Sequence, residues 1–315
     1  MKDERREPPH LLITRLLFPR ADRRRQVALA VALCVLLLLL GSTRADMFLF
    51  PSREIAYHPG KLGLRYETVG FENKKGKRLH GWFIPAQPIR QGGQAAGASA
   101  AGAILVCHGN AGNVGYFLDY PFFLARSNFH VLLFDYQGFG QSAGRASVRA
   151  LQGDVESALA YLLSRGDVDR RRVALLGISL GTAMCLKLAA HQPDVKALVL
   201  EGAFIPKDDL YYIYDQIAWK AIAWPMSRIT HFLFVPRNVS PLDDVRRLDK
   251  TPALFIHGDR DTITSLKSAR KLHDLKPGAK EFVLIEGAGH TPEPHMLAPQ
   301  KVESAVLRFL RTHLK

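Results

Sequence analysis

The hydrophobic positions in the central part of the chain form continuous apolar runs that alternate with amphipathic segments. The segments between the runs, such as 147–165 and 180–192, repeat apolar residues at helical spacing. Strands that are apolar throughout are typical of a parallel sheet with helices on both faces. The runs are 103–109, 129–136, 172–179, 195–203, 252–258 and 281–287.

Two further strands are predicted ahead of these runs, at 64–73 and 77–86, as an antiparallel pair around a short turn. The predicted fold is therefore α/β, with a mostly parallel eight-stranded sheet. A stretch rich in aromatic residues, at about 205–250, interrupts the alternation of strands and helices. We expect this insertion to form a small helical cap above the carboxyl edge of the sheet.

The N-terminal part of the chain has a different pattern. Residues 1–25 carry eight Lys or Arg against four Asp or Glu, and residues 26–43 are eighteen uncharged residues. This pattern predicts a transmembrane signal-anchor at 26–43, although a cleaved signal peptide ending near Ala45 is the alternative. By the positive-inside rule, the domain at 47–315 is then expected on the non-cytoplasmic side, periplasmic or extracellular in a bacterium.

The charge of the chain is +14, which raises nucleic acid as a partner. Outside the N-terminus the basic residues are spread out, with no basic stripe and no nucleic-acid motif, so we expect no nucleic-acid partner. The three cysteines are too scattered for a disulfide framework or a zinc site. No metal or organic cofactor is implied.

The sequence Gly177-Ile-Ser179-Leu-Gly181 contains a candidate catalytic residue, at the point where an apolar run passes into a helical segment. A serine hydroxyl is a poor nucleophile until a base removes its proton and donors stabilise the oxyanion that forms. Gly-x-Ser-x-Gly on a sharp strand-to-helix turn exposes the hydroxyl at the edge of the sheet. We therefore predict Ser179 as the nucleophile.

The base should be a histidine after the last strand, and the orienting acid should follow an earlier strand. His290 comes directly after the last run and its glycine turn, and His295 is the reserve candidate. Asp259 and Asp261 both follow the run at 252–258, and their spacing alone does not separate them.

The oxyanion hole needs two backbone N–H groups, one from the residue after the nucleophile and one from the loop after the first central strand. These requirements assign Leu180 and Asn110. His108 lies in the same loop and is interpreted as a structural residue, because it precedes the serine in the chain.

Five motifs in this order, HGNAGN, LLFDYQGFGQSAG, GISLG, FIHGDRD and EGAGH, resemble the α/β-hydrolase superfamily from about Met47 to the end of the chain. With FLFPSREIAYHP after a hydrophobic segment, the chain is similar to the small-cap branch of membrane-anchored α/β-hydrolase-domain proteins, whose relatives include protein depalmitoylases. The resemblance implies Asp261 as the acid. The chain departs from the family at DTITS, where relatives commonly continue with Val-Pro.

These features predict a serine hydrolase that cleaves a carboxylic ester or thioester through an acyl-enzyme on Ser179. The expected substrate is a small or acylated molecule, and the membrane is an expected partner through the anchor. The alternatives are a peptidase or amidase of the same fold and a non-catalytic, membrane-tethered binding protein. Acyl-chain length, ester or thioester preference and oligomeric state are left open by the sequence.

Overall fold

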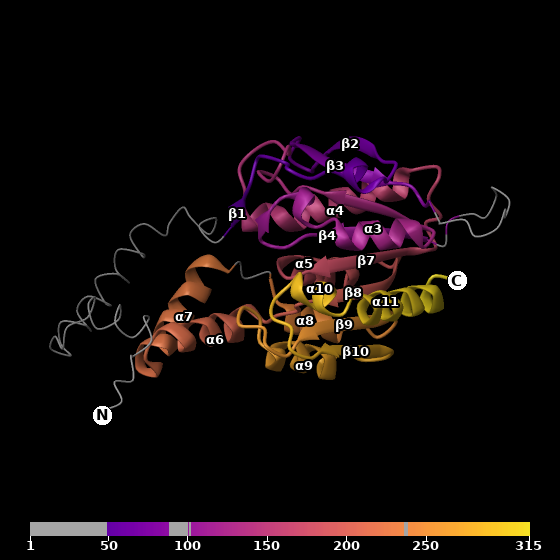
Figure 1. The fold of residues 1–315 in the computed structure, drawn as a ribbon. Coiled ribbons are helices and arrows are strands. Elements are labelled where there is room, and N and C mark those ends of the chain that lie inside the picture. The colour runs from indigo at the N-terminus through magenta and orange to yellow at the C-terminus, as the bar shows by residue number, and fades with distance from the viewer. Residues whose placement is uncertain (1–48, 88–99, 101, 236–238) are drawn as a thin grey trace, which may run out of the picture. The chain divides into compact units, whose positions relative to one another are not determined.

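An eight-stranded sheet forms the centre of the protein (Figure 1). The structure is a computed structural model that describes residues 49–87, 100, 102–235 and 239–315. The strand order is β10-β9-β8-β7-β4-β6-β3-β2, and only the β2–β3 and β3–β6 pairs are antiparallel. This arrangement confirms the predicted mostly parallel, eight-stranded α/β fold. The strands are β2 (Glu67–Glu72), β3 (Arg78–Ile84), β4 (Gly102–Cys107), β6 (Phe129–Phe134), β7 (Val173–Ile178), β8 (Val195–Glu201), β9 (Ala253–Gly258) and β10 (Lys280–Ile285).

Helices cover both faces of the sheet, as the continuous apolar runs require. Every residue of β4, β7 and β9 is buried. One face packs against α3 (Asp119–Arg126) and α11 (Pro299–His313). The other face packs against four helices, which are α4 (Val148–Ser164), α5 (Leu180–Ala189), α8 (Pro241–Arg246) and α9 (Leu266–Leu275).

Two helices stand apart from these layers and form the small helical cap (Figure 1). They are α6 (Pro206–Ile217) and α7 (Lys220–Phe234), and they pack mainly against each other. The aromatic residues that signalled this insertion are partly on its surface, since Trp219 is 65% and Trp224 58% exposed. Because α6 begins five residues after β8 ends, the cap rises from the carboxyl end of that strand.

Short elements complete the described chain and shape the loops above the sheet. β1 (Phe50–Pro51) pairs in parallel with β5 (Ala111–Gly112) in the loop that follows β4. This pairing ties the start of the domain to the loop predicted to supply an oxyanion donor. The other short elements are the 3-10 helices at Pro59–Leu62 and Val114–Tyr116 and the helix α10 (Glu293–Leu297).

The prediction of a transmembrane signal-anchor needs correction. Residues 26–43 lie outside the described residues, and within the described part no helix is long and apolar enough to cross a membrane. The uninterrupted apolar run at 27–40 has fourteen residues, which as a helix would span about 21 Å, against roughly 30 Å for a hydrocarbon core. This finding does not support three predictions: the single-pass location, the non-cytoplasmic placement of the domain and the membrane as a partner.

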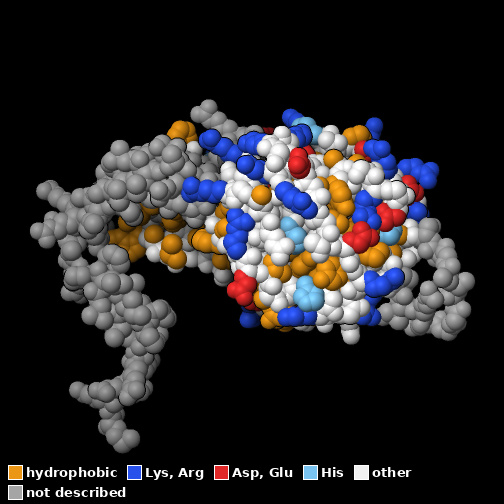
Figure 2. Space-filling model, turned by 90° about the horizontal axis from the view of Figure 1, so that it is seen from above, with side chains coloured by type: hydrophobic (Ala, Val, Ile, Leu, Met, Phe, Trp, Pro, Cys, Tyr) orange, Lys and Arg blue, Asp and Glu red, His pale blue; other side chains and the backbone are white. Residues whose placement is uncertain are grey.

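The surface charge is dispersed on the face shown in Figure 2, where Lys and Arg side chains alternate with acidic, apolar and neutral ones. Among the described residues on that face, no continuous basic stripe is present.

Candidate active site

Ser179 occupies a strained turn between β7 and α5. Its backbone angles are φ 50° and ψ −113°, in the left-handed region that favours glycine. A non-glycine residue in such a conformation costs about 1–3 kcal/mol and persists only where its surroundings impose it. Here the Ser179 N–H donates to the Glu201 carbonyl at 2.8 Å, and the Thr182 hydroxyl and N–H both donate to the Ser179 carbonyl.

The two glycines of the motif are required by close backbone approach. A β-carbon at position 177 would lie 2.7 Å from the Gly181 carbonyl oxygen, and one at position 181 would collide with the Cys107 carbonyl oxygen. Any side chain would therefore push the start of α5 away from the ends of β4 and β7. The glycines let the helix begin directly above the sheet, with the serine side chain at its edge.

The structure brings Ser179, His290 and Asp261 together. Nε2 of His290 lies 3.0 Å from Oγ of Ser179, and Nδ1 lies 2.6 Å from Oδ2 of Asp261. An ionised carboxylate only accepts hydrogen bonds, so Nδ1 carries the proton and Nε2 is free to accept the serine proton. The order and geometry match the arrangement in which a histidine acts as a general base.

The two alternative candidates from the sequence lie elsewhere. His295 is on α10, where its Nε2 lies 3.2 Å from Glu303 and its ring stacks on Phe123. Asp259 accepts the Gly287 N–H at 2.7 Å and so stabilises the turn after β10. These contacts give both residues structural partners outside the Ser179–His290–Asp261 cluster.

Asp261 is buried, with 4% of its surface exposed, and it is surrounded by donors. The N–H groups of Ile263 and Thr264 each donate to Oδ1 at 2.8 Å, and the Thr264 hydroxyl donates to Oδ2 at 2.7 Å. Burial raises the pKa of Asp261, but the hydrogen bonds and charge of His290, together with Thr264, outweigh burial and lower the pKa below its usual value. The carboxylate therefore stays ionised wherever the histidine works as a base.

Thr264 is a site residue that the sequence analysis did not identify. Its hydroxyl also lies 3.3 Å from Nδ1 of His290, so Thr264 contacts both partners of the hydrogen bond between His290 and Asp261. It belongs to the DTITS segment where the chain departs from the family pattern. A threonine three residues after an aspartate is a local turn signal that could have identified it.

Helix α6 of the cap is bonded directly to the loop that carries Asp261. Asp209 accepts the N–H of Ser265 at 2.6 Å, and the Tyr212 hydroxyl donates to the Asp261 carbonyl at 2.9 Å. Gln216 donates to the Thr262 carbonyl at 3.0 Å. The bond from Ser265 uses a backbone N–H that proline lacks, so the departure from Val-Pro supplies a link between the cap and the acid.

The two residues predicted for the oxyanion hole lie at adjoining ends of β4 and α5. Leu180 is the first residue of α5, and the first N–H groups of a helix have no partner within the helix and suit an anion. The Asn110 carbonyl accepts the Phe50 N–H at 3.2 Å, which fixes the loop after β4. A β-carbon on Gly109 would lie 3.7 Å from the Ile178 carbonyl, so this loop runs beside the nucleophile turn.

His108 is buried in the same loop among three aromatic rings, Phe117, Tyr136 and Phe139. Its Nδ1 lies 2.8 Å from the Gly109 carbonyl oxygen. Burial lowers the pKa of His108, so the ring is neutral and packs as part of the core.

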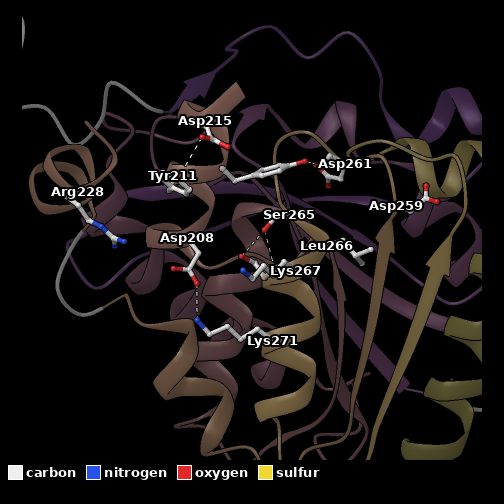
Figure 3. Close-up of a pocket in the computed structure, with 12 residues that line it drawn as sticks. Asp208, Tyr211, Asp215, Arg228, Asp259, Asp261, Ser265, Leu266, Lys267 and Lys271 are labelled. Atoms are coloured by element: carbon white, nitrogen blue, oxygen red, sulfur yellow. Dashed lines mark hydrogen bonds and ion pairs between the residues drawn. The ribbon is translucent and has the colours of Figure 1, made fainter. Parts of the chain in front are cut away.

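A cavity of about 640 Å³ lies between α6 and α9, next to the acid loop. Figure 3 shows the side chains that line it. Asp208, Tyr211 and Asp215 of α6 line one side, and Lys271 of α9 pairs with Asp208 at 2.9 Å. Asp261 also lines the cavity, whereas Ser179 and His290 do not. Among the residues that the structure describes, no group of three or more His, Cys, Asp or Glu could hold a metal ion.

The sequence of the chain is similar to those of known proteins. The profile of a family described as serine aminopeptidase, S33 (Hydrolase_4) matches residues 98–247. The chain is 30% identical to the uncharacterized protein YfhR of Escherichia coli K12, over 84% of this chain and 85% of that protein. It is also 30% identical to the α/β-hydrolase domain-containing protein WAV2 of Arabidopsis thaliana, over 67% and 66% of the two chains.

Among solved structures, an esterase of Pyrococcus furiosus superposes with a TM-score of 0.68 at 17% identity, covering 85% of this chain and 99% of the esterase. The matching family and the named relatives place the protein among hydrolases, and the solved structure shares its fold. The chain belongs to the α/β-hydrolase superfamily. The match confirms the superfamily that the five motifs indicate.

A buried histidine in this site makes stability depend on pH. His257 is 1% exposed, and burial lowers its pKa below the ordinary histidine value in spite of the Asp261 charge 3.7 Å away. A group with a lowered folded-state pKa adds stability above its unfolded pKa and loses it as the pH falls through the folded pKa. We expect wild type to lose its advantage over His257→Gln below about pH 6.5, by up to about 1.4 kcal/mol per pH unit.

The measurement is urea unfolding of both proteins from pH 8 to pH 5. Burial raises the pKa of Glu201 and Asp209, so these two groups change the stability in the opposite direction with pH. Both proteins contain them, so the difference in the free energy of unfolding between the two proteins isolates the effect of His257. A difference in the free energy of unfolding that is constant over this range would contradict the prediction.

Proposed function

We propose that the protein is a serine hydrolase that cleaves a carboxylic ester or thioester through an acyl-enzyme on Ser179. The observation that carries the proposal is the continuous hydrogen-bonded series from Asp261 through His290 to the Ser179 hydroxyl, with distances of 2.6 and 3.0 Å. This series supports removal of the serine proton at the moment when Oγ attacks a carbonyl carbon.

The proposed reaction has two halves. Oγ of Ser179 bonds to the carbonyl carbon while His290 takes the serine proton, and the oxyanion is stabilised by the N–H groups of Leu180 and Asn110. His290 then gives the proton to the departing alcohol or thiol. In the second half His290 takes a proton from water, the hydroxide attacks the acyl carbon, and the acid leaves as Ser179 regains its proton.

A small acyl or aryl compound is the substrate class that fits the cap best. Exposed apolar side chains on α6 and α7, including Ile217 (74%) and Phe232 (71%), lie on the insertion that follows β8. These side chains do not line the cavity between α6 and α9, so the preference for apolar groups over sugars rests on the apolar composition of the insertion itself. The hydrolase fold is consistent with small-molecule substrates.

A peptidase or amidase is the second candidate, favoured by the description of the matching family as a serine aminopeptidase. The same three side chains serve amide cleavage in other proteins, so the site by itself does not exclude it. A non-catalytic binding protein is the remaining alternative, and it is opposed by the close alignment of base and nucleophile.

We expect a fluorophosphonate probe to label the protein once, on Ser179, because only a serine activated by a base reacts at a useful rate. Peptide mapping by mass spectrometry identifies the modified residue. A panel of ester, thioester and anilide substrates with the same acyl group then ranks the candidates, and ester or thioester turnover should exceed anilide turnover. Faster anilide turnover would favour the amidase, and absence of both labelling and turnover would favour the binding protein.

A further inference from the structure

A second buried carboxyl group lies beside the nucleophile, at the end of β8. Glu201 is 1% exposed, and its backbone carbonyl accepts the Ser179 N–H at 2.8 Å. Its side chain lies on the face of the sheet that packs against α3 and α11, and the Tyr120 hydroxyl of α3 donates to its carboxylate. A buried carboxyl group is costly without such partners, so its presence at this position calls for a role.

The side chain of Glu201 lies beneath the loop that carries His290. Glu201, Thr291, Pro292 and Tyr120 line a small cavity of about 10 Å³ between this loop and the sheet. The next residue, Gly202, lies close to the ring, since a β-carbon added there would lie 3.2 Å from Cε1 of His290. The end of β8 therefore contacts both the nucleophile turn and the histidine loop.

We propose that Glu201 is a positioning residue for the reaction proposed above: its carboxylate supports the His290 loop from below and favours the charged ring that forms when His290 takes the serine proton. This inference rests on the proposed function. It assigns to Glu201 a part in proton transfer without contact with the substrate.

The charged groups around Glu201 support this role. Burial raises the pKa of Glu201 above its usual value, and hydrogen bonds from Tyr120 and Thr291 and the neighbouring rings of His295 and His290 offset part of this effect. Electrostatic coupling is reciprocal, so an ionised Glu201 stabilises a protonated His290 by the same free energy. The other titratable groups near this cluster are Tyr116 and Asp119 in the same cavity, Glu303 on α11 through its contact with His295, and Asp261 and His257 beside His290.

The experiment is a pH–rate profile of ester hydrolysis for wild type, Glu201→Gln and Glu201→Asp. Glu201→Gln keeps the shape of the side chain and removes its charge. We expect kcat to fall about tenfold, the equivalent of a one-unit change in proton affinity, with KM within about twofold. The acidic limb of the profile should move to lower pH, because the ring loses a charge that favoured its protonated form.

Glu201→Asp keeps the charge and should retain the wild-type position of the acidic limb. Tyr120→Phe removes only the hydrogen bond that Tyr120 donates to Glu201. Thermal unfolding of each variant then measures how much the contact between Tyr120 and Glu201 contributes to stability. Glu286→Gln, an exposed glutamate near the same loop, is the matched control and should behave as wild type. A merely structural role would lower the melting temperature in Glu201→Gln and leave the acidic limb unmoved, and that result would overturn the inference.

The outcomes separate this inference from the proposed function. An active wild type whose Glu201→Gln variant has an unchanged profile overturns the positioning role alone. A wild type that neither hydrolyses esters nor reacts with a fluorophosphonate overturns the proposed function, and the role of Glu201 with it.

Discussion

Ser179→Ala is expected to lower kcat/KM for an ester substrate by about 10⁴-fold or more, because the nucleophile that forms the acyl-enzyme is removed. The variant should remain folded. Within the part of the chain that the structure describes, the hydroxyl bonds only to His290, and the turn is stabilised by backbone bonds to Glu201 and from Thr182. Alanine also keeps the β-carbon, so the backbone strain at this position is unchanged.

The measurement is steady-state hydrolysis of a p-nitrophenyl ester, with circular dichroism and thermal unfolding to establish that the variant is folded. Ser164→Ala, which changes an exposed serine at the end of α4, is the matched control and should keep wild-type activity. A folded Ser179→Ala protein that retains a tenth or more of the activity would exclude Ser179 as the nucleophile.

Asp261→Asn is expected to lower kcat by about 10³–10⁴-fold with little change in KM. The carboxylate accepts from Nδ1 of His290 at 2.6 Å and so leaves Nε2 without a proton, facing the serine. An asparagine amide can donate to Nδ1 instead, which moves the ring proton to Nε2 and removes the acceptor for the serine proton. The loss is therefore one of chemistry rather than of substrate binding.

Asp259→Asn is the matched control, because it makes the same chemical change two residues earlier in the same loop. Asp259 contacts the Gly287 N–H and not the histidine, so its variant should keep activity within a few fold. Steady-state kinetics on both variants at pH 8, where Asp261 is ionised, compares them directly. If Asp259→Asn lost the larger share of activity, the assignment of the acid would be wrong.

The resemblance to hydrolases was evident in the sequence because its signals are local. Continuous apolar runs predicted a sheet covered on both faces, and all residues of β4, β7 and β9 are buried. The glycines around Ser179 are needed because a side chain at either position would clash within a single turn, so a short motif is enough to identify the turn. The order of the motifs along the chain then indicated the superfamily.

The N-terminal prediction failed because hydrophobic length is a weak signal near its threshold. Fourteen apolar residues give about 21 Å of helix, and the prediction depended on polar flanks to reach about 30 Å. The length of an apolar run cannot decide such a case, since it describes the chain and not its surroundings.

By itself, the sequence determined the layered α/β fold, the turn at Ser179 and the candidate base and acid, because each depends on residues that are neighbours in the chain. Only the tertiary structure decided what surrounds them. Asp209 bonds Ser265 across 56 positions, and Tyr120 bonds Glu201 across 81 positions. Such contacts arise because parallel strands end at one edge of the sheet, and the order of strands in the sheet, which no local pattern encodes, sets which side chains meet there.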